Sequence, residues 1–305
     1  MADNSFCDIL NNQSNVFTQN HMEEIQMYFD LSGLWQADIG DGKVYPMQLP
    51  GTLDENRIGH KDLGQNQWHP DAALGNAEEG FNENAPIATR FTRKYTFEGE
   101  ARLTRRISFT PEEGKRVFLE AERVRYLRLL VDGKEVPHFS EGSLSTPHVF
   151  EVTGLLNGDN EITLLSDNSY PGLPHDAIVY SSAATDETQT NWNGVLGYLR
   201  LRVEEPVFLS ALRIYPDRDG ETLTVQAEVS ADRFWSGTLL VESGALKKEK
   251  SGAQEYAGYQ KKICVQPGLT RFVLEKLPLA GDVRRWDEEE GNLYELTARL
   301  SAKER

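Results

Sequence analysis

The chain has 305 residues, of which 39% are hydrophobic and 26% are charged. This composition is typical of a folded protein that is long enough for two domains, each with its own core. The formal net charge of −16 argues against binding to nucleic acid or to an anionic membrane surface, and no basic stripe offsets it.

The first residues predict a polar arm over 1–28 that is rich in Asn and Gln. They contain no basic segment followed by an apolar one, so no signal peptide is expected. No apolar run approaches the roughly 18–20 residues that cross a bilayer. Cys7 and Cys264 form no disulfide framework, which suits a reducing compartment. We therefore expect a cytoplasmic protein, unless a leader has been removed.

Short strands are expected to fill residues 29–205. Apolar residues first recur at strand spacing near Phe29, and Tyr45 to Ala88 is expected to be a long loop rich in Gly, Asn and Pro. Loops of that length usually bind something. The predicted strands after it are 89–97, 101–109, 116–131 (two strands or one bent strand), 149–152 and 161–165. The turn Asp132-Gly133-Lys134 predicts a hairpin, because Gly accepts a positive φ.

A second domain is expected over 206–305, after the seam Glu204-Glu205-Pro206. Its predicted strands are 207–215, 222–230, 237–242, 259–265, 270–277 and 293–300. The absence of long helical patterns argues against a parallel α/β sheet or a TIM barrel. The expected fold is all-β: a jelly-roll (galactose-binding-like) sandwich followed by an immunoglobulin-like sandwich without the antibody disulfide.

Several motifs, in this order, resemble a known family. They are Leu31-Ser32-Gly33-Leu34-Trp35, Leu49-Pro50-Gly51-Thr52-Leu53-Asp54-Glu55, Arg93-Lys94-Tyr95, Val131-Asp132-Gly133-Lys134, Thr146-Pro147-His148-Val149-Phe150-Glu151-Val152-Thr153, Gly158-Asp159-Asn160 and Thr190-Asn191-Trp192-Asn193-Gly194-Val195-Leu196-Gly197. Their order resembles the amino-terminal sugar-binding domain of glycoside hydrolase family 2, the group of β-galactosidases, β-glucuronidases and β-mannosidases. Residues 207–300 resemble the immunoglobulin-like domain that follows it, with Trp286 and Leu293-Tyr294-Glu295-Leu296 near the closing strand.

The resemblance implies a non-catalytic portion of a hydrolase, of the β-galactosidase type, that acts on O-glycosyl bonds. Retaining glycosidases need two carboxyl groups about 5–5.5 Å apart, and in this family both lie in a catalytic barrel. The expected partners are a β-glycoside and the barrel of the parent chain, with no cofactor. An autonomous carbohydrate-binding module and a protein-interaction scaffold remain alternatives, because one fold serves many functions.

The loop before Gly194 carries the main sugar-binding candidates, which are Asp186, Glu187, Gln189, Asn191 and Trp192. Planar polar groups that bind vicinal hydroxyls, together with an aromatic face, are what sugar recognition requires. The family has an acidic residue six positions before this glycine, where this chain has Thr188. In the alternative interpretation, Trp192 packs in the sandwich and Asn191 ties the loop to the backbone.

Two further groups of candidates lie in loops. Asp167 and Asn168 follow a predicted strand, where such residues bind ligands or cap turns. Asp54, Glu55, Arg57 and Trp68 lie in an early loop that the resemblance places near the active-site entrance, with a structural role as the alternative. The six histidines show no HxH or HExxH spacing, so no metal site is expected.

Overall fold

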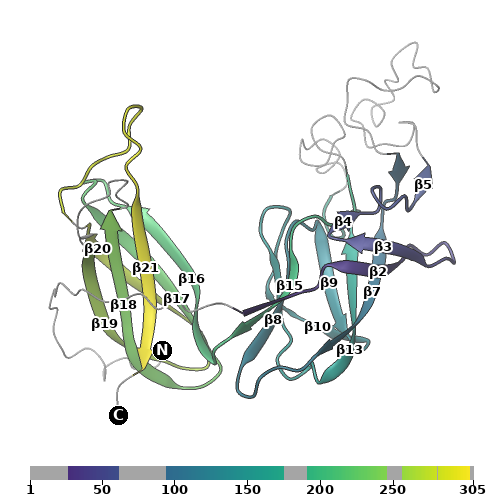
Figure 1. Cartoon of the computed structure of the whole chain (residues 1–305), viewed down its shortest axis with the longest axis horizontal. Coiled ribbons are helices and arrows are strands. Elements are labelled where there is room, and N and C mark those ends of the chain that lie inside the picture. Colours follow the sequence, from purple (N-terminus) through teal and green to yellow (C-terminus); the bar gives the residue numbers. More distant parts are fainter. Residues whose placement is uncertain (1–26, 62–93, 175–190, 246–255, 280, 303–305) are drawn as a thin grey trace. The chain divides into compact units, whose positions relative to one another are not determined.

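A computed structural model describes residues 27–61, 94–174, 191–245, 256–279 and 281–302 (Figure 1). The chain divides into two compact units, 26–204 and 205–305. The described residues form strands and connecting turns, as the all-β prediction requires. No helix among them is long and apolar enough to cross a membrane.

The 26–204 unit is a sandwich of two antiparallel sheets. The five-stranded sheet has the order β1 (Met27–Asp30), β15 (Leu199–Glu204), β8 (Arg116–Ala121), β12 (His148–Glu151) and β11 (His138–Ser140). The six-stranded sheet has the order β10 (Lys134–Val136), β9 (Tyr126–Val131), β13 (Gly158–Asp167), β7 (Glu100–Phe109), β2 (Gly33–Asp38) and β3 (Tyr45–Leu49). Two short pairs complete the unit: β4 (Gly51–Thr52) with β14 (Gly194–Val195), and β5 (His60–Lys61) with β6 (Tyr95–Thr96).

Alternating apolar residues build the core between these sheets. Leu199, Leu201 and Val203 of β15 are buried, and so are alternate residues of β9. Trp35 of β2 is 1% exposed, and its indole N–H donates to the carbonyl of Leu31 at 3.1 Å. The Leu31–Trp35 motif is therefore a core element.

The outer face of the five-stranded sheet is unusual because its charged side chains are also buried. On β8, Arg116, Phe118 and Glu120 are 5%, 0% and 6% exposed. The guanidinium carbons of Arg116 and Arg202 lie 5.1 and 4.8 Å from the centroid of the Phe118 ring, and cover it. We call this group of stacked guanidinium groups, rings and carboxylates the arginine ladder.

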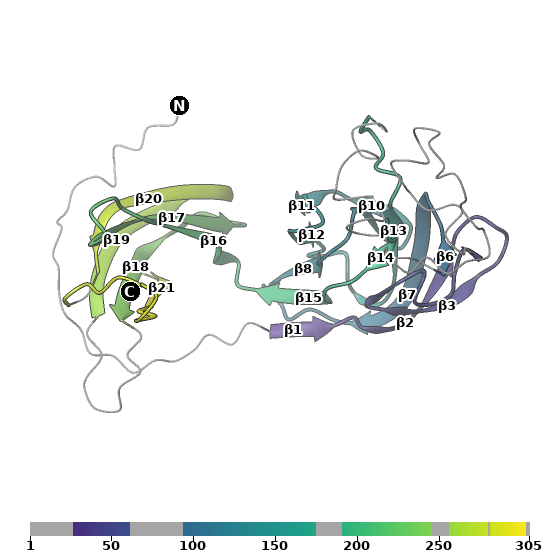
Figure 2. The same cartoon turned by 90° about the horizontal axis from the view of Figure 1, so that it is seen from above.

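The 205–305 unit consists of two three-stranded antiparallel sheets around a second core, seen in profile in Figure 2. The first contains β16 (Val207–Pro216), β17 (Thr222–Ala231) and β20 (Gly268–Pro278). The second contains β19 (Tyr256–Val265), β18 (Trp235–Ala245) and β21 (Tyr294–Ala302). Each of these strands contains the corresponding predicted strand, apart from Leu293, which precedes β21.

The start of the first strand and the early loop differ from the expected elements. Strand pairing begins at Met27, two residues before Phe29, because Met27 pairs with Val203 of the neighbouring strand. The prediction of a loop from Tyr45 to Ala88 is wrong over its first part, since β3, β4 and β5 lie there. Met47 and Leu49 are both 0% exposed, and Pro46 is tolerated because β3 is an edge strand.

Candidate functional site

Buried asparagines connect the loops at one end of the 26–204 unit. The Asn168 side-chain amide donates to the main-chain carbonyls of Phe97 and Asn191, both at 2.8 Å. Its oxygen accepts the N–H of Gly99 at 3.0 Å. Asn191 returns the contact, because its amide donates to the carbonyl of Asn168 at 3.1 Å. Three segments that are distant in sequence are thereby held together.

Asn193 extends this cluster toward β14. Its amide donates to the carbonyl of Gly99 at 2.8 Å, and its oxygen accepts the hydroxyl of Ser166 at 2.7 Å. The following Gly194 has a φ of +128°, and a Cβ there would lie 2.4 Å from the carbonyl oxygen of Gly51. Only glycine fits this position, so the sequence fixes the path of the chain directly after Trp192.

Beside the cluster of Asn168, Asn191 and Asn193, one guanidinium group stacks with two aromatic rings. Arg125, only 7% exposed, has its guanidinium carbon 4.8 Å from the Trp192 ring centroid and 5.6 Å from that of Tyr170. Its Nε donates to the carbonyl of Trp192 at 3.0 Å, and its Nη1 donates to the Tyr170 hydroxyl. Both rings are half-buried, so each keeps part of its surface in solvent at a sheet end. We call these residues the Trp192 platform.

The predicted sugar-binding residues of this region have distinct surroundings. Asn168 and Asn191 are 0% and 1% exposed, so they shape the loops. Asp167 accepts the N–H and the hydroxyl of Ser169 at 2.7 and 2.6 Å, which is the turn-capping alternative. Asn191 makes the backbone tether of the alternative interpretation, and Trp192 has a partly exposed ring while its carbonyl accepts from Arg125.

Four predicted residues lie outside the described part of the chain. They are Asp186, Glu187, Gln189 and Trp68. Their roles stay predictions.

The early loop is organised by its own side chains. Asp54 accepts the N–H groups of Lys94 and Tyr95 at 3.0 and 2.8 Å, across about forty residues of sequence. Glu55 accepts the N–H of Thr52 at 2.9 Å, while the Thr52 hydroxyl accepts the N–H of Glu55 at 3.1 Å. This reciprocal pair is a capping box. Exposed Arg57 follows with a left-handed φ of 59°.

Three further residues organise these loops, and sequence reasoning missed one of them, Arg125. Asn56 bonds both main-chain groups of Gln48, at 2.7 and 3.2 Å. Tyr170 and Arg125 complete the Trp192 platform. The available signal for Arg125 was a charged residue within the mostly apolar and aromatic segment 124–131, which also contains Arg128.

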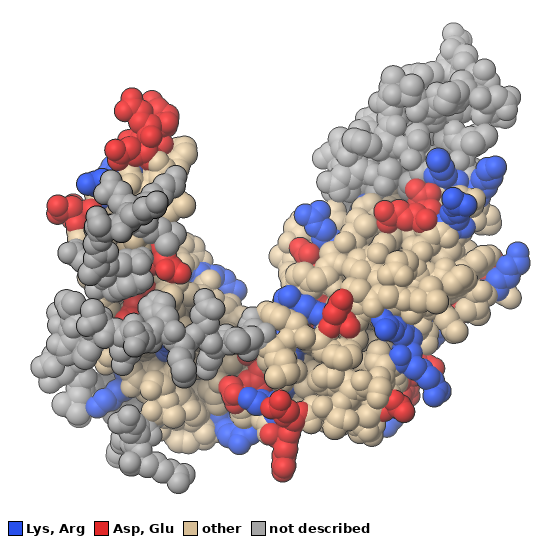
Figure 3. Space-filling view, viewed as in Figure 1, with Lys and Arg blue, Asp and Glu red and all other residues tan. Residues whose placement is uncertain are grey.

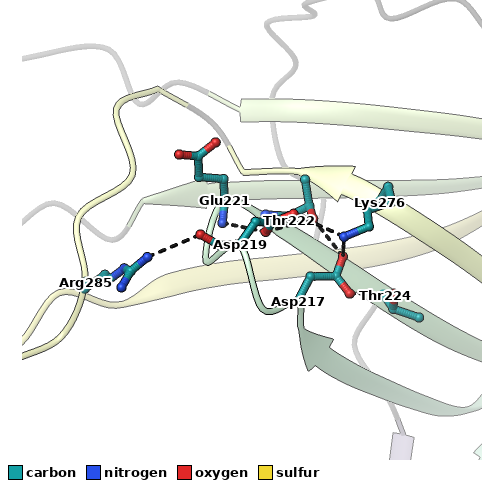
Figure 4. A network of polar contacts seen from close by, with 7 residues as sticks. All are labelled: Asp217, Asp219, Glu221, Thr222, Thr224, Lys276 and Arg285. Atoms are coloured by element: carbon teal, nitrogen blue, oxygen red, sulfur yellow. Dashed lines mark hydrogen bonds and ion pairs between the residues drawn. The ribbon is translucent and has the colours of Figure 1, made fainter.

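A second polar network lies in the 205–305 unit, around the turn between β16 and β17 (Figure 4). Lys276 Nζ lies 3.4 Å from Asp217 and 3.1 Å from Asp219. Asp219 also accepts the N–H groups of Glu221 and Thr222, both at 2.9 Å. The network fixes the turn against β20.

The two aspartates of this network are unsuited to donate protons. Main-chain donation from Glu221 is the largest cause that lowers the pKa of Asp219, and the Thr222 hydroxyl is the largest for Asp217. Because both pKa values are lowered, both carboxyls are ionised at neutral pH. Glycoside hydrolysis needs one carboxyl to be protonated, so this pair lacks the acid partner.

Two histidines meet in the five-stranded sheet of the 26–204 unit. His138 Nε2 and His148 Nδ1 are 3.2 Å apart, and His148 is 1% exposed. Burial is the main cause that lowers both pKa values, that of His148 to about 4. Among the described residues, no group of three or more His, Cys, Asp and Glu side chains is placed to hold a metal ion.

Comparison with known proteins gives a likeness in structure. No family model and no curated protein matches the sequence. A GH2 β-galacturonidase from Eisenbergiella tayi, bound to galacturonate, matches 92% of this chain and 41% of its own, at 19% identity and a TM-score of 0.55. A β-glucuronidase from glycoside hydrolase family 2 matches 93% of this chain and 30% of its own, at 12% identity and a TM-score of 0.61. A β-D-mannosidase from Dictyoglomus thermophilum matches 90% and 34%, at 15% identity and a TM-score of 0.55.

The likeness confirms the expected resemblance to structures of family 2 enzymes. At these identities it establishes the fold, which is all-β with antiparallel sheets packed as sandwiches. The chain spans 30–41% of the length of these three structures.

Proposed function

We propose that this chain is the non-catalytic, carbohydrate-binding portion of a family 2 type glycoside hydrolase that cleaves a β-glycoside, as a β-galactosidase does. The Trp192 platform carries the proposal, because it presents a fixed aromatic ring at a sheet end. Pyranose rings place their C–H bonds on one face, which an aromatic ring contacts, while guanidinium and amide groups bind the hydroxyls. The likeness to a β-galacturonidase, a β-glucuronidase and a β-D-mannosidase supports a shared role of this fold beside a β-linked sugar.

Catalysis is assigned to a further domain that supplies the two carboxyl groups. In this proposal the 26–204 unit contributes to the entrance of that domain's active site. The early loop with Asp54 and Glu55 supports this, because internal hydrogen bonds give it a defined form at the surface. Turnover of nitrophenyl β-glycosides by the purified 305-residue chain would contradict the assignment.

Substitution Trp192→Ala is expected to weaken binding of β-galactosides to the chain about tenfold, since stacking area is lost. Trp192→Phe keeps an aromatic face and should retain most of the affinity. Both are measured by following amide and indole N–H signals by NMR while methyl β-galactoside is added. The control is Phe234→Ala in the other unit, where the ring is 59% exposed. Equal affinities for Trp192→Ala and the unsubstituted chain would contradict a sugar-binding role for Trp192.

A further inference from the structure

The 205–305 unit contains a hollow of about 490 Å³ between the β16–β17 turn and the loop that joins β20 to β21. This volume lies within the range of small-molecule sites. Residues that line it include Arg218, Arg284, Trp286, Asn292 and Tyr294, above an apolar floor to which Leu223 contributes. All of its lining residues belong to this one unit.

The first wall of the hollow is fixed by the Asp217–Asp219–Lys276 network (Figure 4). Arg285 ties it to the second wall, because its Nη2 donates to the carbonyl of Asp219 at 3.2 Å. The Arg285 guanidinium packs against Gly220, where a Cβ would lie 2.9 Å from Nη2. The turn and the loop therefore meet in a defined contact.

The second wall is held by hydrogen bonds within the loop. The Asn292 amide donates to the carbonyl of Arg285 at 2.9 Å, and the Tyr294 hydroxyl accepts the N–H of Arg284 at 2.8 Å. Asp287 caps the tip by accepting the N–H groups of Glu289 and Glu290 at 2.9 and 2.6 Å. These hydrogen bonds define the form of the second wall.

Trp286 is the most exposed large hydrophobic residue of the described chain, at 67%. The backbone of Gly291 packs near its indole, since a Cβ there would lie 3.4 Å from the indole nitrogen. An aromatic ring beside a hollow lined by guanidinium and amide groups combines the apolar and polar surfaces of a small-molecule site. Its flat face suits the C–H face of a pyranose.

The hollow is lined by charges of both signs, which are those of Arg218, Arg284, Arg285 and Glu295. The guanidinium groups of Arg218 and Arg284 make no hydrogen bond or ion pair with other described residues, so their donors remain for a ligand. The loop tip beside them is acidic, with the exposed run 287–290 (Figure 3). The four acidic residues of this run, together with Glu295 in the lining, offset the charge of the three guanidinium groups, so an uncharged ligand whose hydroxyls accept from the guanidinium groups is the better match.

We propose that this hollow is a second carbohydrate site, which takes a residue of an uncharged pyranoside chain. Trp286 provides the stacking surface, and Arg218, Arg284 and Asn292 bind hydroxyls. The site is independent of the Trp192 platform, because it is built wholly from the other unit.

The test is an NMR titration of the 305-residue chain with two probes, β-1,4-galactotriose and trigalacturonate. The neutral probe is expected to shift the Trp286 indole N–H signal, with an affinity at least about tenfold higher than that of the acidic probe. Trp286→Ala should remove binding at this unit and leave the shifts at Trp192 unchanged. Trp192→Ala should remove the shifts around residue 192 and leave binding at Trp286 unchanged. The two proposed sites are therefore tested independently of each other.

The controls separate loss of the site from loss of the fold. Phe234→Ala removes another exposed ring, at 59%, and should leave binding intact. Arg218→Met should weaken binding of galactotriose while the thermal midpoint stays unchanged, because its guanidinium has no partner in the described chain. The proposal is overturned if galactotriose leaves the Trp286 signal unmoved, or if trigalacturonate binds as tightly.

Discussion

Substitution Glu120→Ala is expected to destabilise the 26–204 unit by about 3–5 kcal/mol. The Glu120 side chain is 8% exposed and accepts the Nε–H groups of Arg200 and Arg202, at 2.9 and 2.6 Å. Alanine would leave the guanidinium groups of Arg200 and Arg202 without this carboxylate. Arg202, which is 12% exposed, still pairs with Glu204, and Arg200 at 26% regains some hydration.

The free energy of unfolding in urea, followed by tryptophan fluorescence, measures this loss. The matched control is Glu161→Ala, whose partner Arg106 lies 4.0 Å away with side-chain exposures of 44% and 83%. A pair so exposed contributes at most about 0.5 kcal/mol. Similar losses in the two variants would show that the ladder carries no special stability. Glu120→Gln keeps the volume and one acceptor, and should fall between them.

Acidification from about pH 7 to pH 4 is expected to remove about 3 kcal/mol of stability from the same unit through His148. Burial, with a smaller contribution from His138, lowers its pKa from 6.5 to about 4. The unfolded chain therefore binds a proton near pH 6.5, and the folded chain binds it only near pH 4. Stability is complete above pH 6.5 and declines as the pH falls toward 4.

The surroundings of His148 define the test. It faces His138 and the main chain of Val124 and Gly142, with Glu141 acting weakly in the opposite direction on its pKa. His148→Gln should reduce the dependence of the urea midpoint of unfolding on pH between pH 7 and pH 4. The control His60→Gln, at an exposed position, should leave that dependence unchanged. If His148→Gln does not fold, the imidazole signals of the unsubstituted chain decide the matter. A His148 titration near pH 6.5 would contradict the prediction.

Most strands were predictable because their side chains alternate. β9 and β17 place apolar residues on every second position, and β7 does so apart from Arg105. The hairpin at Asp132 and Gly133 has the two positive φ angles, 48° and 77°, of a two-residue turn. β3 escaped prediction because Pro46 and Pro50 obscure the alternation of buried Met47 and Leu49.

The sequence predicts which loops form the candidate site around Trp192, but it does not predict the contacts between those loops. The sequence indicates that Asn168 and Asn191 lie in loops, where short amides bind ligands or backbone. Their burial depends on Phe97 and Gly99, about seventy residues before Asn168, and this packing leaves no mark on local periodicity. Arg125 was missed for the same reason, since Tyr170 and Trp192 reach it from distant loops.

The position of β15 in its sheet determines when the 26–204 unit can complete its folding during synthesis. β1 and β8 both take β15 as their neighbour, although β15 is made at the end of the unit. When Ala121 has left the ribosome, both β1 and β8 are outside it, whereas β15, which lies between them in the sheet, is not. The five-stranded sheet can close only after Glu204 has left the exit tunnel. Such distant pairing slows folding, so the nascent chain exposes two strand edges to chaperones or to neighbouring chains for that interval.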